Sequence, residues 1–107
     1  MSNRIIFREA ADADQDDIAD YLTRVSGDDR IGHRWLTAVK REGEYAVEYP
    51  TQTPPLIGFS NRPDGPLRRR IITGFRNYLL FYRFDDETVT VTRILHGSRD
   101  LRRVPDL

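Results

Sequence analysis

The sequence predicts an α+β fold in which a helical hairpin packs on one face of an antiparallel sheet. Three observations predict it. A short β-branched and aromatic segment stands near the start, two amphipathic helical patterns follow, and three apolar strand patterns with short connections come last. The chain has 107 residues, of which 38% are apolar and 32% charged, so we expect one globular domain spanning residues 1–107.

Residues 4–8 are the first predicted strand, because they combine isoleucines and a phenylalanine in a short run. Its place in the sheet does not follow from the pattern. Asp12 and Asp14 are candidate N-caps for the first helix, and Gly27 is expected to end it. The apolar positions of this helix repeat at i, i+3, i+4 and i+7: Ile18, Tyr21, Leu22 and Val25.

The second predicted helix begins at Asp28 or Asp29 and is ended by Pro50. Trp35 is its expected core anchor. The stripe around it consists of Leu36, Val39 and Ala46. Since the break between the two helices is only one or two residues long, they should form an antiparallel hairpin.

Residues 51–67 are rich in proline and glycine and predict a connecting loop. The loop is long for so small a domain, so we expect disorder or contact with a ligand there. Three strands should follow, over residues 67–75, 78–84 and 88–95, joined by hairpin-length connections. They predict an antiparallel meander.

The net charge of zero conceals two oppositely charged halves. Residues 1–50 carry seven basic and eleven acidic groups, and residues 51–107 carry ten and six, giving −4 and +4. All basic residues but Lys40 are arginines, whose planar fork pairs with carboxylate or phosphate. The C-terminal half therefore suits either nucleic acid or an acidic protein segment, and charge alone does not choose between them.

The candidate binding residues are the cationic side chains of the last three strands and the tail. Arg83 and Arg93 stand within or beside apolar strands, so at least one should reach a carboxylate at the edge of a buried face, with Asp100 as the candidate partner. Leu101 and Val104 are expected to form the apolar side of a final helical turn. The full predicted set is Arg68, Arg70, Arg76, Arg83, Arg93, His96, Arg99, Arg102 and Arg103.

Few residues have the pattern of a catalytic or metal site. His33 is expected to be a solvated helix residue, whereas His96 either places a general acid or base near Arg99 or fixes its own turn through a ring hydrogen bond. The sequence has no cysteine, no metal-ligand spacing and no phosphate-binding glycine loop, so we expect neither metal nor cofactor. Without a signal peptide or an apolar span, a cytoplasmic location with no membrane partner is expected.

The string from Arg93 to Leu101, RILHGSRDL, follows the strand YLLFYR and ends the predicted order of elements. In these features the chain resembles the RelE/ParE superfamily of toxins from type II toxin-antitoxin systems, and the string is closer to the ParE branch. The resemblance implies the same α+β fold and a role in growth arrest and plasmid stabilisation. It also implies a cognate antitoxin whose disordered tail wraps the toxin.

The resemblance leaves three functions open. A ParE-like protein binds and blocks DNA gyrase without chemistry, through the arginine-rich C-terminal stretch, and we favour this function. A RelE-like protein cuts messenger RNA on the ribosome, which would use His96 and Arg99; however, Leu79 and Pro105 stand where that branch usually has a basic residue and a tyrosine. The third is an inactive toxin-like binding module.

Overall fold

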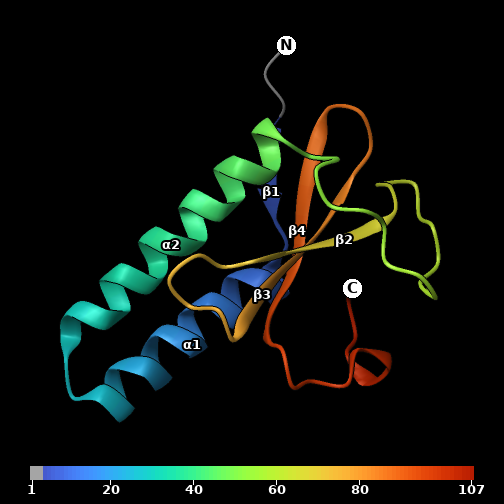
Figure 1. The fold of residues 1–107 in the computed structure, drawn as a ribbon. Helices are drawn as coiled ribbons and strands as arrows, with labels where there is room; N and C mark the ends of the chain where they lie inside the picture. The colour runs from blue at the N-terminus through green and yellow to red at the C-terminus, as the bar shows by residue number, and fades with distance from the viewer. Residues whose placement is uncertain (1–3) are drawn as a thin grey trace.

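A computed structural model describes residues 4–107, whose secondary structure follows the predicted order (Figure 1). The elements are β1 (Arg4–Phe7), α1 (Glu9–Ser26), α2 (Asp29–Glu48), β2 (Leu67–Ile71), β3 (Tyr78–Phe84), β4 (Thr88–His96) and a 3₁₀ turn, η1 (Leu101–Arg103). The predicted α+β class is confirmed. No helix in the described part of the chain is both long and apolar enough to cross a membrane.

The sheet is mixed rather than wholly antiparallel. Its order is β1-β4-β3-β2, and β2, β3 and β4 form the predicted antiparallel meander. β1 pairs in parallel with β4, from Arg4 opposite Thr88 to Phe7 opposite Val91. This parallel pairing departs from the predicted antiparallel sheet. The helical hairpin between β1 and the meander makes it possible, since a parallel neighbour needs a long crossover.

Two element boundaries differ from the prediction. α1 begins at Glu9, before the proposed caps Asp12 and Asp14, because the Arg8 backbone N–H donates to Val91 O at 3.0 Å and the chain passes directly from strand pairing into the helix. β2 ends at Ile71, not at residue 75, because Gly74 adopts a φ of 89° and turns the chain.

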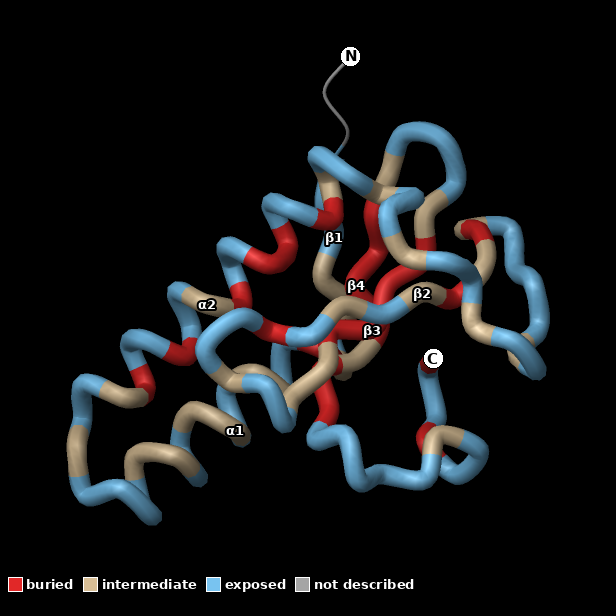
Figure 2. Tube along the Cα trace, viewed as in Figure 1, coloured by how far each residue is buried: buried red, intermediate tan, exposed pale blue. Residues whose placement is uncertain are grey.

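The junction between the two helices was predicted correctly. Gly27 ends α1 with a φ of 68°, and its N–H donates to Thr23 O. Asp28 caps α2, since its carboxylate accepts the Arg30 backbone N–H at 2.9 Å. The helices lie together on one side of the sheet, and their inner faces are buried against it (Figures 1 and 2).

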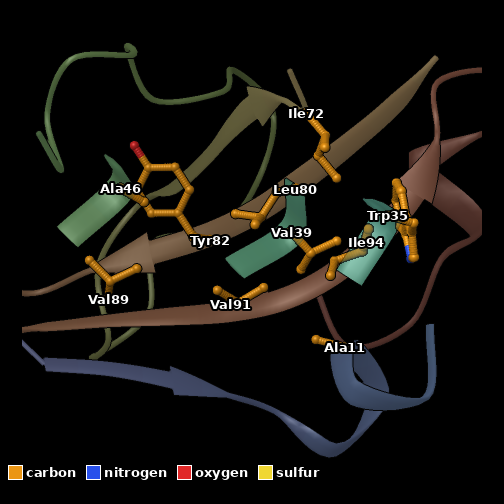
Figure 3. Close-up of a cluster of buried hydrophobic side chains, with 10 residues drawn as sticks. All are labelled: Ala11, Trp35, Val39, Ala46, Ile72, Leu80, Tyr82, Val89, Val91 and Ile94. Atoms are coloured by element: carbon orange, nitrogen blue, oxygen red, sulfur yellow. The ribbon is translucent and has the colours of Figure 1, made fainter. Parts of the chain in front are cut away.

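The main core lies between the helices and the sheet (Figure 3). Trp35 is fully buried, stands edge-on to Phe75 and Tyr78, and donates its indole N–H to Gln15 O at 2.9 Å, so its role as anchor is confirmed. Leu36 is exposed, so the apolar stripe of α2 is narrower than expected. The buried cluster consists of Ala11, Trp35, Val39, Ala46, Ile72, Leu80, Tyr82, Val89, Val91 and Ile94.

A second core covers the opposite face of the sheet. The tail after β4 and the loop between α2 and β2 lie over this face, away from the helices (Figure 1). Val104 is buried there, as predicted for the final turn, and Leu56 and Phe59 of the loop pack beside it. The long loop is therefore partly a structural cover. The buried members of the cluster are Leu67, Phe81, Leu95, Val104 and Leu107.

A bulge in β4 sets which side chains face each core. Phe81 is opposite Arg93 but Tyr82 is opposite Val91, so Thr92 has no partner in β3. The extra residue reverses the alternation, and Val91 and Ile94 consequently belong to the same core. Arg93 thus does not share a face with Val91, although residues two positions apart in a regular strand do.

Asp14 of α1 closes the edge of β4 where β1 ends. Its carboxylate accepts two bonds from Arg93, from Nε at 2.7 Å and Nη2 at 2.9 Å, and a third from the Ile94 backbone N–H at 3.0 Å. Both side chains are 13% exposed. Asp14, not Asp100, is therefore the partner of Arg93; Asp100 caps η1 by accepting the Arg102 N–H. The sequence could not show this pairing, because 79 positions separate the two residues.

Replacing Asp14 should strongly destabilise the chain. We expect Asp14→Ala to lower the free energy of unfolding by about 3 kcal/mol, because it leaves the Arg93 guanidinium and the Ile94 N–H partly buried without their acceptor. Urea unfolding followed by circular dichroism measures the loss. Asp16→Ala is the matched control on the exposed side of α1 and should change stability by less than about 0.5 kcal/mol. Equal losses in both variants would refute this role for Asp14.

Gly65 should tolerate no side chain. Its φ is 100°, and an added Cβ would stand 1.9 Å from the Phe84 carbonyl oxygen, so Gly65→Ala should cost more than about 3 kcal/mol. Gly58 has a φ of 91° with nothing within 4 Å of an added Cβ. Gly58→Ala therefore measures the backbone strain alone, without a steric clash, and should cost about 1 kcal/mol. Thermal melts compare the two. A smaller loss at Gly65 than at Gly58 would contradict the close approach.

Candidate binding surface

Four of the predicted binding residues hold the chain's own elements together. Arg68 donates to the Thr53 carbonyl oxygen, and Arg70 donates to Glu42 Oε2 and to Gln52 Oε1, each at 2.8 Å. The Arg70 side chain is only 14% exposed. These two arginines therefore attach β2 to α2 and to the loop that follows α2.

Glu42 explains why Arg70 is held so firmly. The carboxylate is buried and also accepts the backbone N–H of Thr73 at 3.2 Å and its hydroxyl at 2.9 Å. A buried carboxylate is tolerated when its charge is paired and its oxygens are hydrogen-bonded. The charge of Arg70 is thereby offset within the chain, and a partner would have to displace Glu42 to use it.

Arg83 is fully buried and bonds to oxygens of the loop and the tail. Its Nη1 donates to Ser60 O at 3.0 Å and Gly65 O at 2.8 Å, and its Nη2 donates to Leu107 O at 3.2 Å. Burial is the largest cause that lowers the pKa of Arg83, with nearby Arg62 as the next. In this position Arg83 ties the loop and the tail to β3.

Arg93 likewise has its partners inside the chain. In addition to its paired bonds with Asp14, it donates from Nη1 to the Pro105 carbonyl oxygen at 3.0 Å. The hydrogen bonds that Arg93 donates to Asp14 are the largest cause that raises the pKa of Arg93. This residue connects α1, β4 and the tail.

The remaining predicted residues are exposed, and three of them form what we call the cationic rim: Arg76, His96 and Arg99. The β2–β3 turn meets the end of β4 here, because the Gly97 N–H donates to Asn77 O at 2.7 Å. Among residues 4–107, neither rim arginine has a carboxylate within ion-pair distance. Arg103 lies in η1, 3.7 Å from Asp100, and both are exposed.

His96 fixes its own turn, which was one of the two alternatives for this residue. Its Nδ1 accepts the Ser98 backbone N–H at 3.1 Å and lies 2.8 Å from the Ser98 hydroxyl. A ring nitrogen that accepts a backbone N–H places the proton of the neutral ring on Nε2. The ring also stands edge-on to Tyr78, with centroids 5.3 Å apart. Its orientation is set by these contacts.

A hollow of about 270 Å³ lies beside His96 and Arg99. Its wall includes Asp14 and Asp17 of α1 together with Tyr21. Arg93 offsets the charge of Asp14, but in the described structure no ion pair offsets that of Asp17. Negative charge in the wall opposes a phosphodiester backbone there.

The sequence prediction missed a groove of about 600 Å³ beside β2. The loop contributes Pro54, Leu56 and Ile57, and the strand contributes Arg69 and Ile71. Ile57 is 97% exposed and Ile71 is 57% exposed. Strand alternation places Arg69 on the face opposite Arg68 and Arg70, but it gives no sign that the loop stands against this edge.

Residues 4–107 contain no cluster of three or more histidine, aspartate or glutamate side chains that could hold a metal ion. His33 lines a separate hollow between α2 and the β2–β3 turn and is exposed, as expected for a solvated helix residue.

The chain was compared with known families and structures. The sequence model of the ParE toxin of type II toxin-antitoxin systems, parDE, matches residues 5–101. A chain of the solved structure titled "Chromosomal ParDE TA system from P. aeruginosa" has the same fold, with a TM-score of 0.69 at 15% identity over 89% of this chain and 96% of that one. No individual curated protein matches the sequence. Because the family match covers nearly the whole chain, the protein belongs to the ParE toxin family of type II toxin-antitoxin systems.

Proposed function

We propose that this toxin arrests growth by binding DNA gyrase, with no chemical step of its own. Gyrase inhibition and neutralisation by an antitoxin are general properties of the ParE family. The observation that supports gyrase as the target here is the cationic rim, in which Arg76 and Arg99 are exposed at the end of the sheet and make no ion pair within residues 4–107. Arginine forks in this state suit the carboxylates of a protein partner.

The site offers little support for the ribonuclease alternative. Cleavage through the 2′-hydroxyl needs a proton carrier and cations around the phosphate. His96 Nδ1 is occupied by Ser98, which leaves only Nε2 for a proton transfer, and Asp17 lines the hollow beside His96 and Arg99. Arg93 of β4 is bound to Asp14. We therefore propose binding rather than catalysis.

The gyrase proposal is tested with a double variant, Arg76→Gln and Arg99→Gln. Losing two charged contacts should raise the toxin concentration needed to inhibit supercoiling by at least about tenfold, since about 1.4 kcal/mol corresponds to tenfold in affinity. Arg24→Gln, at the far end of the helical hairpin, is the control and should behave as the unmodified chain. Arg93 is not substituted, because a change of its charge would break its ion pair with Asp14.

The same purified toxin is added to a translating extract, and the message is analysed by primer extension. No cleavage at defined codon positions is expected. Cleavage without any loss of supercoiling would replace the gyrase proposal with the ribonuclease function. If neither assay responds to folded toxin, the inactive-module function is the correct one.

A ParDE system implies an antitoxin partner, and we propose that the antitoxin occupies the groove beside β2. β2 is the last strand of the sheet, and on its outer edge Leu67 O accepts the Leu56 N–H of the loop at 2.8 Å. Alternation then directs the backbone groups of Arg69 and Ile71 outward as well. An extended acidic segment could pair with this edge, cover the exposed isoleucines and bond to Arg69.

The groove proposal predicts a specific loss of antitoxin affinity. Ile57→Asp combined with Ile71→Asp should weaken binding of the cognate antitoxin at least about tenfold, because the apolar contact is lost and acidic charges face an acidic segment. Titration calorimetry measures the affinity. Val25→Asp introduces the same charge at an exposed apolar site on α1 and should have no effect. Unchanged affinity in the double variant would place the antitoxin elsewhere.

A further inference from the structure

The turn that follows β4 sets where Arg99 stands relative to the rest of the cationic rim. It runs from His96 to Arg99, and the Arg99 backbone N–H donates to His96 O at 3.1 Å. The Gly97 N–H, which donates to Asn77 O, fixes the same turn to the residue that follows Arg76. The spacing of the two rim arginines therefore depends on the shape of one short turn.

Hydrogen bonds from His96, rather than glycine geometry, give this turn its shape. Gly97 does not adopt a positive φ, and an added Cβ would make an ordinary contact with Asn77 O at 3.5 Å. The two amides after Gly97 are both accepted by His96. Its ring Nδ1 takes the Ser98 N–H at 3.1 Å, and its backbone oxygen takes the Arg99 N–H.

The His96 ring is itself held in place from the core. It stands edge-on to Tyr78, with centroids 5.3 Å apart, and Tyr78 stands edge-on to Trp35 at 5.0 Å. Trp35 is fully buried between the helices and the sheet. A continuous set of contacts thus runs from the main core through two aromatic rings to the Ser98 amide.

The groups that share the hollow with the His96 ring come from α1, from β3 and from the turn itself. The titratable or charged ones are Asp14, Asp17, Tyr21, Tyr78 and Arg99, and Arg93 is bound to Asp14. Aspartate, tyrosine and arginine side chains ordinarily titrate well outside the range from about pH 6 to about pH 8. Imidazole takes up its second proton within this range, so a change in the rim there reports on the ring.

We propose that His96 is the positioning residue of the cationic rim: its neutral ring holds the turn that places Arg99 beside Arg76 for gyrase. This inference rests on the proposed function and adds a dependence on one proton. A proton on Nδ1 turns the acceptor into a donor. The Ser98 hydroxyl, 2.8 Å away, can accept from it, but the Ser98 backbone N–H then loses its partner. The turn is therefore held at higher pH and released as the pH falls.

The substitution test compares variants of the toxin in the supercoiling assay. His96→Ala removes the acceptor and should raise the concentration for half-inhibition about fivefold, the effect of one net hydrogen bond. His96→Asn should recover most of the inhibition, because its side-chain oxygen accepts the amide two residues later, as in an Asx turn. Both variants lack the ring and its contact with Tyr78, so the acceptor alone separates them. His33→Ala, at the exposed histidine of α2, is the control.

The pH test repeats the assay at about pH 8 and about pH 6 with the unmodified toxin and with His96→Asn. The ratio of their half-inhibition concentrations cancels the pH dependence of gyrase itself. The unmodified toxin should weaken at least about twofold relative to His96→Asn at the lower pH, because only its acceptor takes up a proton. If the added positive charge mattered more than the turn, inhibition would strengthen instead, and that result would overturn the proposal.

NMR relaxation of the backbone amides tests the turn without gyrase. The Ser98 and Arg99 amides should be as ordered as those of β4 in the unmodified chain and in His96→Asn, and mobile in His96→Ala. If the unmodified toxin does not inhibit gyrase, the proposed function fails, while these amides still decide the role of His96. Ordered amides in His96→Ala would refute that role. So would equal inhibition by His96→Ala and the unmodified toxin, or an equal loss in both His96 variants.

Discussion

The carboxylate of Asp14 joins three parts of the chain at the point where β1 stops covering β4. β1 reaches only as far as Val91, so the next outward-facing amide, that of Ile94, would lack a partner at a partly buried edge. Asp14 accepts this amide and the Arg93 fork together, and Arg93 in turn holds the Pro105 carbonyl oxygen. One side chain thus sets the packing of α1 on the sheet and the path of the tail.

That constraint determines which arginines remain for partners. A domain of this size has a small core, and it uses guanidinium groups where a larger protein would use apolar contacts. Arg70 and Arg93 close the gaps between helices and strands, and Arg83 joins the loop and tail to β3. Arginines without an ion pair in the described structure, such as Arg76 and Arg99, lie where the chain turns. Substitutions at these exposed positions do not disturb the core.

The element order and most boundaries could be predicted, because they depend on local patterns such as the Gly27 stop, the Asp28 cap and the apolar stripe around Trp35. The parallel pairing of β1 and the second core could not, since both depend on contacts between distant segments. The same limit applies to the site. Composition indicated a cationic C-terminal half, but only the bulge at Thr92 and the distant Asp14 decide that Arg93 faces inward.

The separation of structural from free arginines also bears on how one small toxin can meet two proteins. If the same side chains held the fold together and bound the target, an antitoxin that competed for them would have to unfold the toxin. Here Arg69 and the groove beside β2 lie along the last strand of the sheet, whereas Arg76, His96 and Arg99 lie where β3 begins and β4 ends. With the two sites proposed above, an antitoxin could begin to bind in the groove without displacing gyrase from the rim. Neutralisation would then require the antitoxin chain to extend from the groove to the rim, which suits a long, flexible partner better than a compact one.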